Sequence, residues 1–124
     1  MTDNKILIGD DNEEIARSLA KALKTRGLES ELVSTPSEVI DKAKAQGYCV
    51  IITDLNSTQE GNEGYDVLRA IKDLPTPKIL FTGRREFECA IEGIEAGADY
   101  VVLQKNSSEL MQVLDELKIG EEKW

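Results

Sequence analysis

The chain has 124 residues, a net charge of −9 and no histidine. This length suffices for one domain with a hydrophobic core, and the acidic surface argues against direct nucleic-acid binding, because the phosphate backbone would repel it. Without histidine, Ser-His-Asp and Cys-His nucleophiles and His-based zinc sites are excluded. No run of roughly 20 apolar residues and no signal peptide is present, so we expect a cytoplasmic protein with no membrane partner.

The first half of the chain alternates strand-length apolar runs with segments of helical period, which is typical of an α/β fold with a parallel sheet. Run 6–9 precedes a helix that ends near Gly27, a residue suited to a left-handed cap. Strand 28–33 contains interspersed polar residues, which favours the edge of the sheet. The segment 35–38, Thr-Pro-Ser-Glu, predicts the capped start of a second helix, and the apolar strand 49–53 is expected at the centre of the sheet.

The second half continues this alternation, with a polar stretch at 56–64 before the third helix and a strand at 79–81. The fourth helix is predicted to bury an inner stripe made of Phe87, Ala90, Ile91 and Ile94. Its outer face would then present Glu86, Glu88, Glu92 and Glu95. Strand 100–103 and a helix that opens at Asn106 complete a domain expected to span 1–119. The segment 120–124 is interpreted as a flexible tail or the start of a linker.

Residues that can handle a phosphoryl group follow four of the predicted strands. Asp10 and Asp11 follow the first strand, Asp54 the third, Thr82 the fourth and Lys105 the fifth. The carboxyl ends of parallel strands meet at one edge, where ligands of open α/β sheets bind. Three carboxylates at this edge would repel one another unless a hard divalent cation such as Mg²⁺ lay among them. The sequence therefore predicts a metal-dependent site.

These residues resemble the motifs of the receiver domain of two-component response regulators, over nearly the whole chain. The matching pieces, in chain order, are Asp10-Asp11, Asp54, Thr82-Gly83, the segment 95–99 and Lys105. The resemblance is to single-domain, chemotaxis-regulator-like members of the family. It implies a flavodoxin-like, doubly wound parallel sheet of five strands in the order 2-1-3-4-5, with five helices.

The resemblance also implies a role for each matching residue. Asp54 would accept a phosphoryl group from a sensor histidine kinase or a phosphotransfer protein, while Lys105 and Thr82 would each contact a phosphoryl oxygen. The implied Mg²⁺ ligands are Asp10, Asp11, Asp54 and the backbone carbonyl of Asn56. Such a chain is not an enzyme but a phosphoacceptor that assists its own Mg²⁺-dependent phosphorylation and dephosphorylation. Its output would be contact with a downstream protein through the face of the fourth helix, fifth strand and fifth helix.

The loop after the phosphoacceptor and the position of the lysine depart from the family pattern. Position 58 is threonine instead of proline, and the loop after Asp54 is two residues longer than usual. Lys105 lies one residue later than expected and is followed by Asn106, where the family has a cis-linked proline. Either a bulge brings Lys105 to the site or Gln104 faces it instead.

The third departure concerns the family's switch aromatic, which is replaced by Val102, with Tyr100 a candidate one pleat earlier. The departures leave open a phosphorylation-independent pseudo-receiver that acts as a docking module. A Mg²⁺-dependent phosphatase is a further alternative, although such enzymes carry an acid two residues after the nucleophile, where this chain has Asn56. Asp11 could also simply cap the first helix in a capping box with Glu14.

Overall fold

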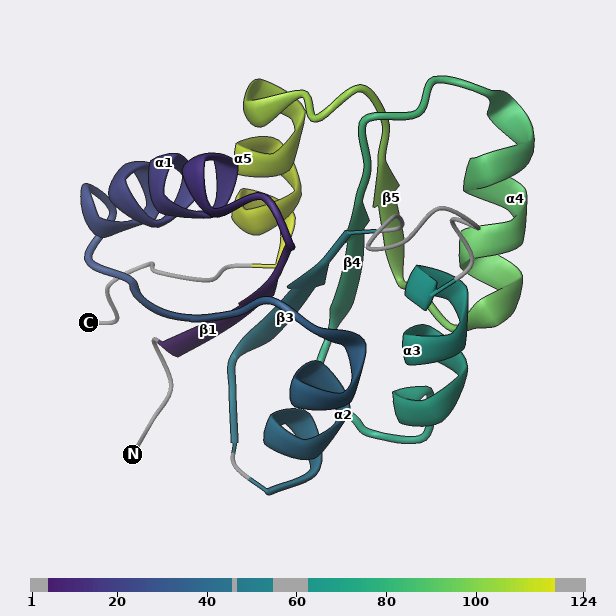
Figure 1. The fold of residues 1–124 in the computed structure, drawn as a ribbon. Coiled ribbons are helices and arrows are strands. Elements are labelled where there is room, and N and C mark those ends of the chain that lie inside the picture. Colours follow the sequence, from purple (N-terminus) through teal and green to yellow (C-terminus); the bar gives the residue numbers. More distant parts are fainter. Residues whose placement is uncertain (1–4, 46, 55–62, 118–124) are drawn as a thin grey trace.

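The computed structural model describes residues 5–45, 47–54 and 63–117, in which five strands and five helices alternate (Figure 1). The strands are β1 (Lys5–Gly9), β2 (Glu29–Val33), β3 (Val50–Thr53), β4 (Lys78–Phe81) and β5 (Tyr100–Val102). The helices are α1 (Glu13–Lys24), α2 (Pro36–Ala45), α3 (Glu63–Ile71), α4 (Phe87–Ala96) and α5 (Ser107–Glu116). The tail predicted at 120–124 and most of the polar stretch at 56–64 lie outside the described residues.

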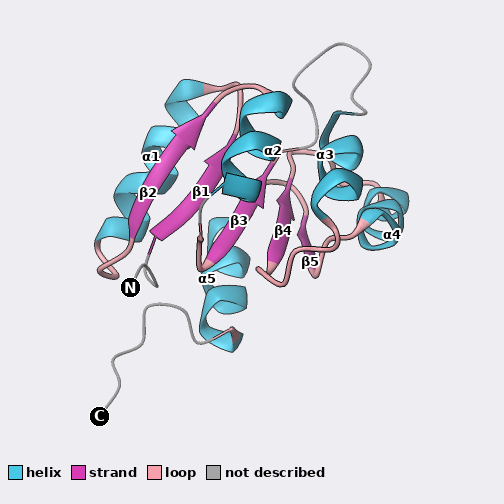
Figure 2. Ribbon diagram, turned by 90° about the horizontal axis from the view of Figure 1, so that it is seen from below, coloured by secondary structure: helices cyan, strands magenta, loops and turns pink. Residues whose placement is uncertain are grey.

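All strand pairs are parallel, and the sheet has the order β2-β1-β3-β4-β5. Helices α1 and α5 cover one face of the sheet, and α2, α3 and α4 cover the other (Figures 1 and 2). The prediction of a doubly wound sheet of order 2-1-3-4-5 is confirmed. The register places Gly9 of β1 beside Thr53 of β3, so the residues that follow these two strands are neighbours in space.

The three central strands are buried on both faces, which explains their nearly continuous apolar sequences. Ile6 and Ile8 of β1 pack in the core cluster that includes α1 and α5 residues, whereas Leu7 packs in the cluster with residues of α2 and α3. Strand β2 lies at the edge, as predicted, and two of its five residues are exposed. The sheet thus forms a buried, closely packed base for the loops at its carboxyl edge.

An ionic network joins the edge strand to the helix beside it. The Glu31 carboxylate lies 2.6 Å from Lys42 Nζ and 3.4 Å from Lys5 Nζ, and it accepts a hydrogen bond of 2.9 Å from the Tyr48 hydroxyl. The hydrogen bonds from Lys42 and Tyr48 lower the pKa of Glu31 to about 2. Burial and the neighbouring Glu31 carboxylate raise the pKa of Tyr48 to about 12. Glu31 is therefore held as an anion.

The helix starts follow the predicted capping residues with one exception. Asn106 Oδ1 accepts a hydrogen bond of 3.1 Å from the Glu109 N–H, as expected for the cap of α5. At α1, however, the cap is Asn12, whose Oδ1 accepts from the Ile15 N–H. The alternative in which Asp11 caps this helix is wrong, because the helix begins one residue later than that capping box requires. Asp11 is left exposed at the strand end.

The orientation of α4 also differs from the prediction. Its buried residues are the small ones, Cys89, Gly93 and Ala96. Three residues of the predicted inner stripe instead face solvent, with exposed fractions of 72% for Phe87, 45% for Ile91 and 50% for Ile94, while Ala90 is half-buried. Hydrophobicity at helical spacing was thus a misleading guide to the buried face of this helix.

Close packing of α4 against the sheet explains this orientation. A Cβ atom on Gly93 would lie 2.8 Å from Leu80 Cδ2 and 2.9 Å from Val101 Cγ2, closer than real Cβ contacts. The helix can approach β4 and β5 this closely only with a residue that has no side chain at position 93. Larger side chains are consequently directed away from the sheet.

Candidate functional site

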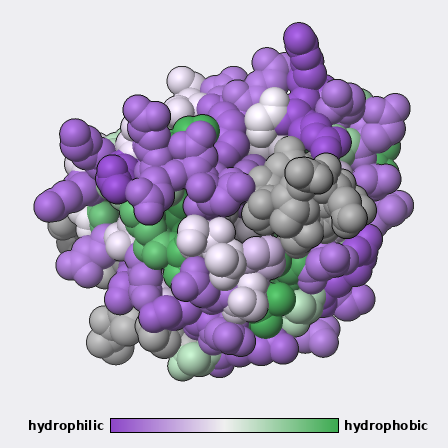
Figure 3. Space-filling model, viewed as in Figure 1, coloured by the Kyte–Doolittle hydropathy of each residue, from purple (hydrophilic) through white to green (hydrophobic). Residues whose placement is uncertain are grey.

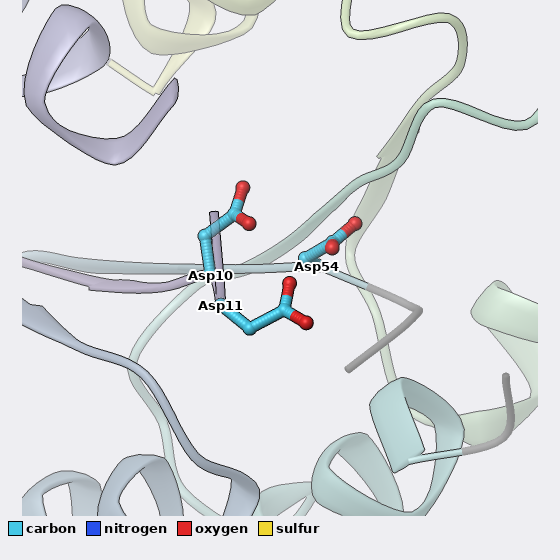
Figure 4. A group of neighbouring side chains, drawn as sticks. All are labelled: Asp10, Asp11 and Asp54. Atoms are coloured by element: carbon cyan, nitrogen blue, oxygen red, sulfur yellow. The ribbon is translucent and has the colours of Figure 1, made fainter. Parts of the chain in front are cut away.

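Three aspartates lie together at the carboxyl ends of β1 and β3 (Figure 4). One carboxylate oxygen from each of Asp10, Asp11 and Asp54 lies within 4.8 Å of the other two. The strand register causes this proximity, and the Asp54 N–H donates a hydrogen bond of 2.9 Å to the Gly9 carbonyl. Asp10 is buried, Asp54 is half-buried and Asp11 is exposed, so the cluster opens to solvent on one side.

The ammonium group of Lys105, a residue that follows the edge strand β5, joins this cluster. Lys105 Nζ donates a hydrogen bond of 2.5 Å to Asp10 Oδ2 and lies 3.5 Å from Asp54 Oδ1. The ammonium also lies 5.4 Å from the centroid of the Phe81 ring, at a distance typical of cation–π contacts. Of the two residues considered from the sequence, the structure places Lys105 beside the aspartates and leaves Gln104 exposed.

The backbone reaches this position through two successive left-handed residues, Gln104 with φ 59° and Lys105 with φ 48°. Each costs roughly 1–2 kcal/mol for a residue with a side chain. Two backbone hydrogen bonds of 2.8 Å hold the turn: the Gln104 N–H donates to the Arg84 carbonyl and the Lys105 N–H donates to the Thr82 carbonyl. Lys105 thus reaches the site through a left-handed turn that is hydrogen-bonded to the β4–α4 connection, and not through the bulge considered as one alternative.

Thr82 is fully buried at the end of β4, next to this turn. Its N–H donates to the Val102 carbonyl at 3.0 Å, and its hydroxyl accepts a hydrogen bond of 3.2 Å from the Arg84 N–H. Val102 is completely buried, and Tyr100 is half-buried and packs against the α1/α5 side of the core. Asn56, the remaining predicted site residue, lies outside the described residues.

The donor set suits a hard divalent cation. Three carboxylates face one ammonium, and carboxylate oxygens are the protein ligands that Mg²⁺ takes. A narrow cavity beside Asp10, Asp11 and Asp54 also contacts Ser34 and Thr35 of the β2–α2 connection. Sequence reasoning missed these two residues and also Phe81, whose place at the end of a continuously buried strand was its only signal.

Comparison with known proteins places most of the chain in one family. A family model described as the response regulator receiver domain matches residues 6–115. The transcriptional regulatory protein YkoG of Bacillus subtilis is 33% identical over 114 residues, which are 90% of this chain and 49% of that protein. The acid tolerance regulatory protein ActR of Rhizobium meliloti is 30% identical over 90% of this chain and 58% of its own length. The chain thus spans about half the length of these curated relatives.

Solved structures give the same result as the family model. The chemotaxis response regulator CheY4 of Vibrio cholerae has a TM-score of 0.80 at 26% identity, covering 94% of this chain and 99% of the other. A CheY-like receiver domain protein from Methanospirillum hungatei gives the same score and identity, covering 94% and 95%. The receiver domain of the Francisella response regulator 1452 shares the fold, with a TM-score of 0.82 at 22% identity over 92% and 95%. In the part of the chain that the structure describes, no helix combines the length and apolarity needed to cross a membrane. The chain belongs to the response regulator receiver domain family.

Proposed function

We propose that this receiver domain is phosphorylated on Asp54 by a sensor histidine kinase or a phosphotransfer protein. The observation that carries the proposal is the position of Lys105 Nζ, 2.5 Å from Asp10 and 3.5 Å from Asp54 within a cluster of three carboxylates. Asp54 is the half-buried member of that cluster and is partly open to a donor. The domain acts as a signalling module that assists its own modification.

In the proposed transfer, a carboxylate oxygen of Asp54 attacks the phosphorus atom of the donor phosphohistidine. The P–N bond breaks, the imidazole leaves with the electron pair and an acyl phosphate forms on Asp54. The carboxylate and the phosphoryl group are both anionic and repel each other. The Lys105 ammonium reduces this repulsion, because it lies beside Asp54 and can pair with an equatorial phosphoryl oxygen.

Mg²⁺ fits the oxygen donor set of this site. Asp10, Asp11 and Asp54 would hold the ion together with the backbone carbonyl of Asn56. When bound, the ion would neutralise charge on the phosphoryl oxygens. The Lys105 ammonium pairs with Asp10 in the same cluster and offsets part of its negative charge.

The signal would leave the site through the hydroxyl of Thr82. In the proposed switch, this hydroxyl gives up the Arg84 N–H and donates to a phosphoryl oxygen, which changes the β4–α4 connection. The same connection is bonded to Gln104 and Lys105, so the two turns would move together. The output would be contact of the α4, β5 and α5 face with a downstream protein, and not direct binding to nucleic acid.

Intact mass after incubation with acetyl phosphate and Mg²⁺ tests the proposal. We expect the wild type to gain one phosphoryl group, which Asp54→Asn abolishes. The matched control is Asp41→Asn, which makes the same chemical change at an exposed position on α2 and should leave the gain intact. A folded wild type that gains no phosphoryl group would instead favour the phosphorylation-independent docking module.

A further inference from the structure

The outer face of α4 presents an apolar stripe to solvent. Phe87, Ile91 and Ile94 are exposed by 72%, 45% and 50%, and their spacing of i, i+4 and i+7 places them on one face of the helix. Of the four exposed large hydrophobic residues in the described part of the chain, these are three. Helix α4 forms the outer edge of the molecule beside α3 and β5 (Figure 1). Single exposed apolar residues are ordinary, but a stripe of this kind on one helix indicates a binding surface.

Surface hydropathy fits this assignment. Most of the face shown in Figure 3 is hydrophilic, with small green apolar areas, one of them at the right-hand edge, where Figure 1 places α4. The stripe is not a by-product of poor packing, because Gly93 makes the contact between α4 and the sheet tight.

A row of acidic side chains runs beside the stripe. Glu88, Glu92 and Glu95 repeat the spacing i, i+4 and i+7 and are all exposed. None of the three forms an ion pair with lysine or arginine among the described residues. Glu92 and Glu95 line a groove between α3 and α4, and the cation among the described residues of that groove, Arg69, is paired with Asp66 at 2.9 Å. Within the described residues, the Tyr65 hydroxyl hydrogen-bonds to Glu92, but no lysine or arginine forms an ion pair with the row.

We infer that the α4 face binds a basic amphipathic helix of another protein, in which apolar residues cover the stripe and lysine or arginine residues lie along the glutamate row. This inference rests on the proposed function, since it assigns a partner chemistry to the output face. Apolar anchors flanked by charge are how amphipathic helices recognise a surface. Arg84 and Arg85 precede α4, so the partner's cationic row lies along the body of the helix and away from its start.

A second copy of the chain does not fit this surface. Packing two α4 stripes together would bring two rows of glutamates near each other, in molecules that each carry a net charge of −9. Like charges placed opposite one another are a common means of suppressing a wrong partner. Charge complementarity thus selects a cationic partner over self-association.

The test uses a designed helical peptide with leucine at i, i+4, i+7 and i+11 and lysine beside each leucine. A matched peptide carries glutamate in place of every lysine. Binding is measured by fluorescence anisotropy with the full chain, before and after phosphorylation by acetyl phosphate and Mg²⁺. The lysine peptide should bind, and the glutamate peptide should not. Phe87→Ala and Ile91→Ala should each weaken binding by about tenfold or more, as expected for buried apolar anchors. Alanine is compatible with exposed helix positions, so both variants should fold.

Two further variants separate the charge from the apolar stripe. Glu88→Gln combined with Glu95→Gln should weaken binding by roughly three- to tenfold and reduce its salt dependence. Leu32→Ala is the control, because Leu32 is the fourth exposed large hydrophobic among the described residues and lies on the edge strand β2, across the sheet from α4. It should leave the affinity unchanged.

The possible failures can be told apart. Equal affinity for both peptides, or no loss in Phe87→Ala and Ile91→Ala, would overturn the inference. So would a dimer in sedimentation that Ile91→Ala dissociates, because the stripe would then serve a second copy. Phosphorylation of Asp54 without α4-dependent binding in either state overturns the inference and leaves the proposed function intact. Binding that depends on α4 in a chain that cannot be phosphorylated supports the inference and contradicts the proposed function.

Discussion

Replacement of Lys105 by methionine should destabilise the fold in the absence of divalent cations. The side chain of Asp10 is only 5% exposed and that of Lys105 only 19%, and the two are 2.5 Å apart. Removal of one partner from a buried ion pair costs about 3–5 kcal/mol, because the remaining charge is left unpaired. The partial exposure of Lys105 reduces this cost through solvent screening, so we expect a loss of about 2–3 kcal/mol in the free energy of unfolding.

The assay is urea denaturation at neutral pH in the presence of a chelator. Methionine keeps an unbranched side chain of similar size but removes the ammonium, and with it the cation–π contact with Phe81. Lys21→Met is the matched control, since it removes a charge from an exposed position on α1. In the Asp10→Asn background the effect of Lys105→Met should shrink, because the buried carboxylate is then absent.

Equal changes in stability for Lys105→Met and Lys21→Met, or an effect of Lys105→Met that is the same in the Asp10→Asn background, would contradict a stabilising Asp10–Lys105 ion pair. Mg²⁺ gives a second readout of the same cluster. At ten times its dissociation constant it should stabilise the wild type by about 1.4 kcal/mol. Relative to its stability without Mg²⁺, Lys105→Met should gain more free energy of unfolding from the ion than the wild type does, because its carboxylates lack the lysine ammonium. A high-salt control separates this effect from general screening.

Three further predictions concern single positions. Gln104→Gly should stabilise the fold by about 0.5–1 kcal/mol, because φ is 59° there and glycine adopts this conformation without strain. The control Gln112→Gly, inside helix α5, should destabilise the fold by about 1 kcal/mol. Equal losses of stability in urea denaturation would contradict the prediction. Gly93→Ala should destabilise by about 1–3 kcal/mol, because its Cβ would overlap the sheet. The control is Gly83→Ala, whose Cβ would lie 3.9 Å from Lys105 Cγ and which should change stability by less than about 0.5 kcal/mol. A lower melting temperature for Gly83→Ala than for Gly93→Ala would be inconsistent with the packing described. The pKa of Glu31 falls from 4.5 to about 2 on folding, so the side chain contributes stability above pH 4.5 that is lost as the pH drops through 2. Glu31→Gln should therefore differ most from the wild type above pH 4.5 and least near pH 2, and a gap that does not change with pH would argue against the network.

The sheet and its carboxyl edge could be predicted from the sequence because each strand carries its own signal. Continuous apolar runs mark the central strands, and interspersed polar residues mark β2 as the edge. Once the strands are parallel, the residues that follow them must meet, which is why Asp10 and Asp54 were expected to be neighbours. These inferences depend on local pattern and topology alone.

The remaining features depend on tertiary contacts that the pattern does not encode. The buried face of α4 is selected by the space above Leu80 and Val101, which admits Gly93 but no larger residue. The path of Lys105 depends on two residues with a left-handed backbone conformation. Neither of them is glycine or asparagine, the residues that usually indicate this conformation in a sequence. A shift of one residue in the start of α1 likewise moved the cap to Asn12. Packing and backbone strain decided each of these cases.

The contact of α4 with the sheet through Gly93 and other small residues has a consequence for diversification. The side chains that anchor this helix are a different set from those that it offers to solvent. If α4 is the docking face proposed above, substitutions on the outer set would change the binding partner while the interior and the aspartate cluster stay as they are. A change of partner at this surface, by mutation or by engineering, would require no compensating substitutions in the core.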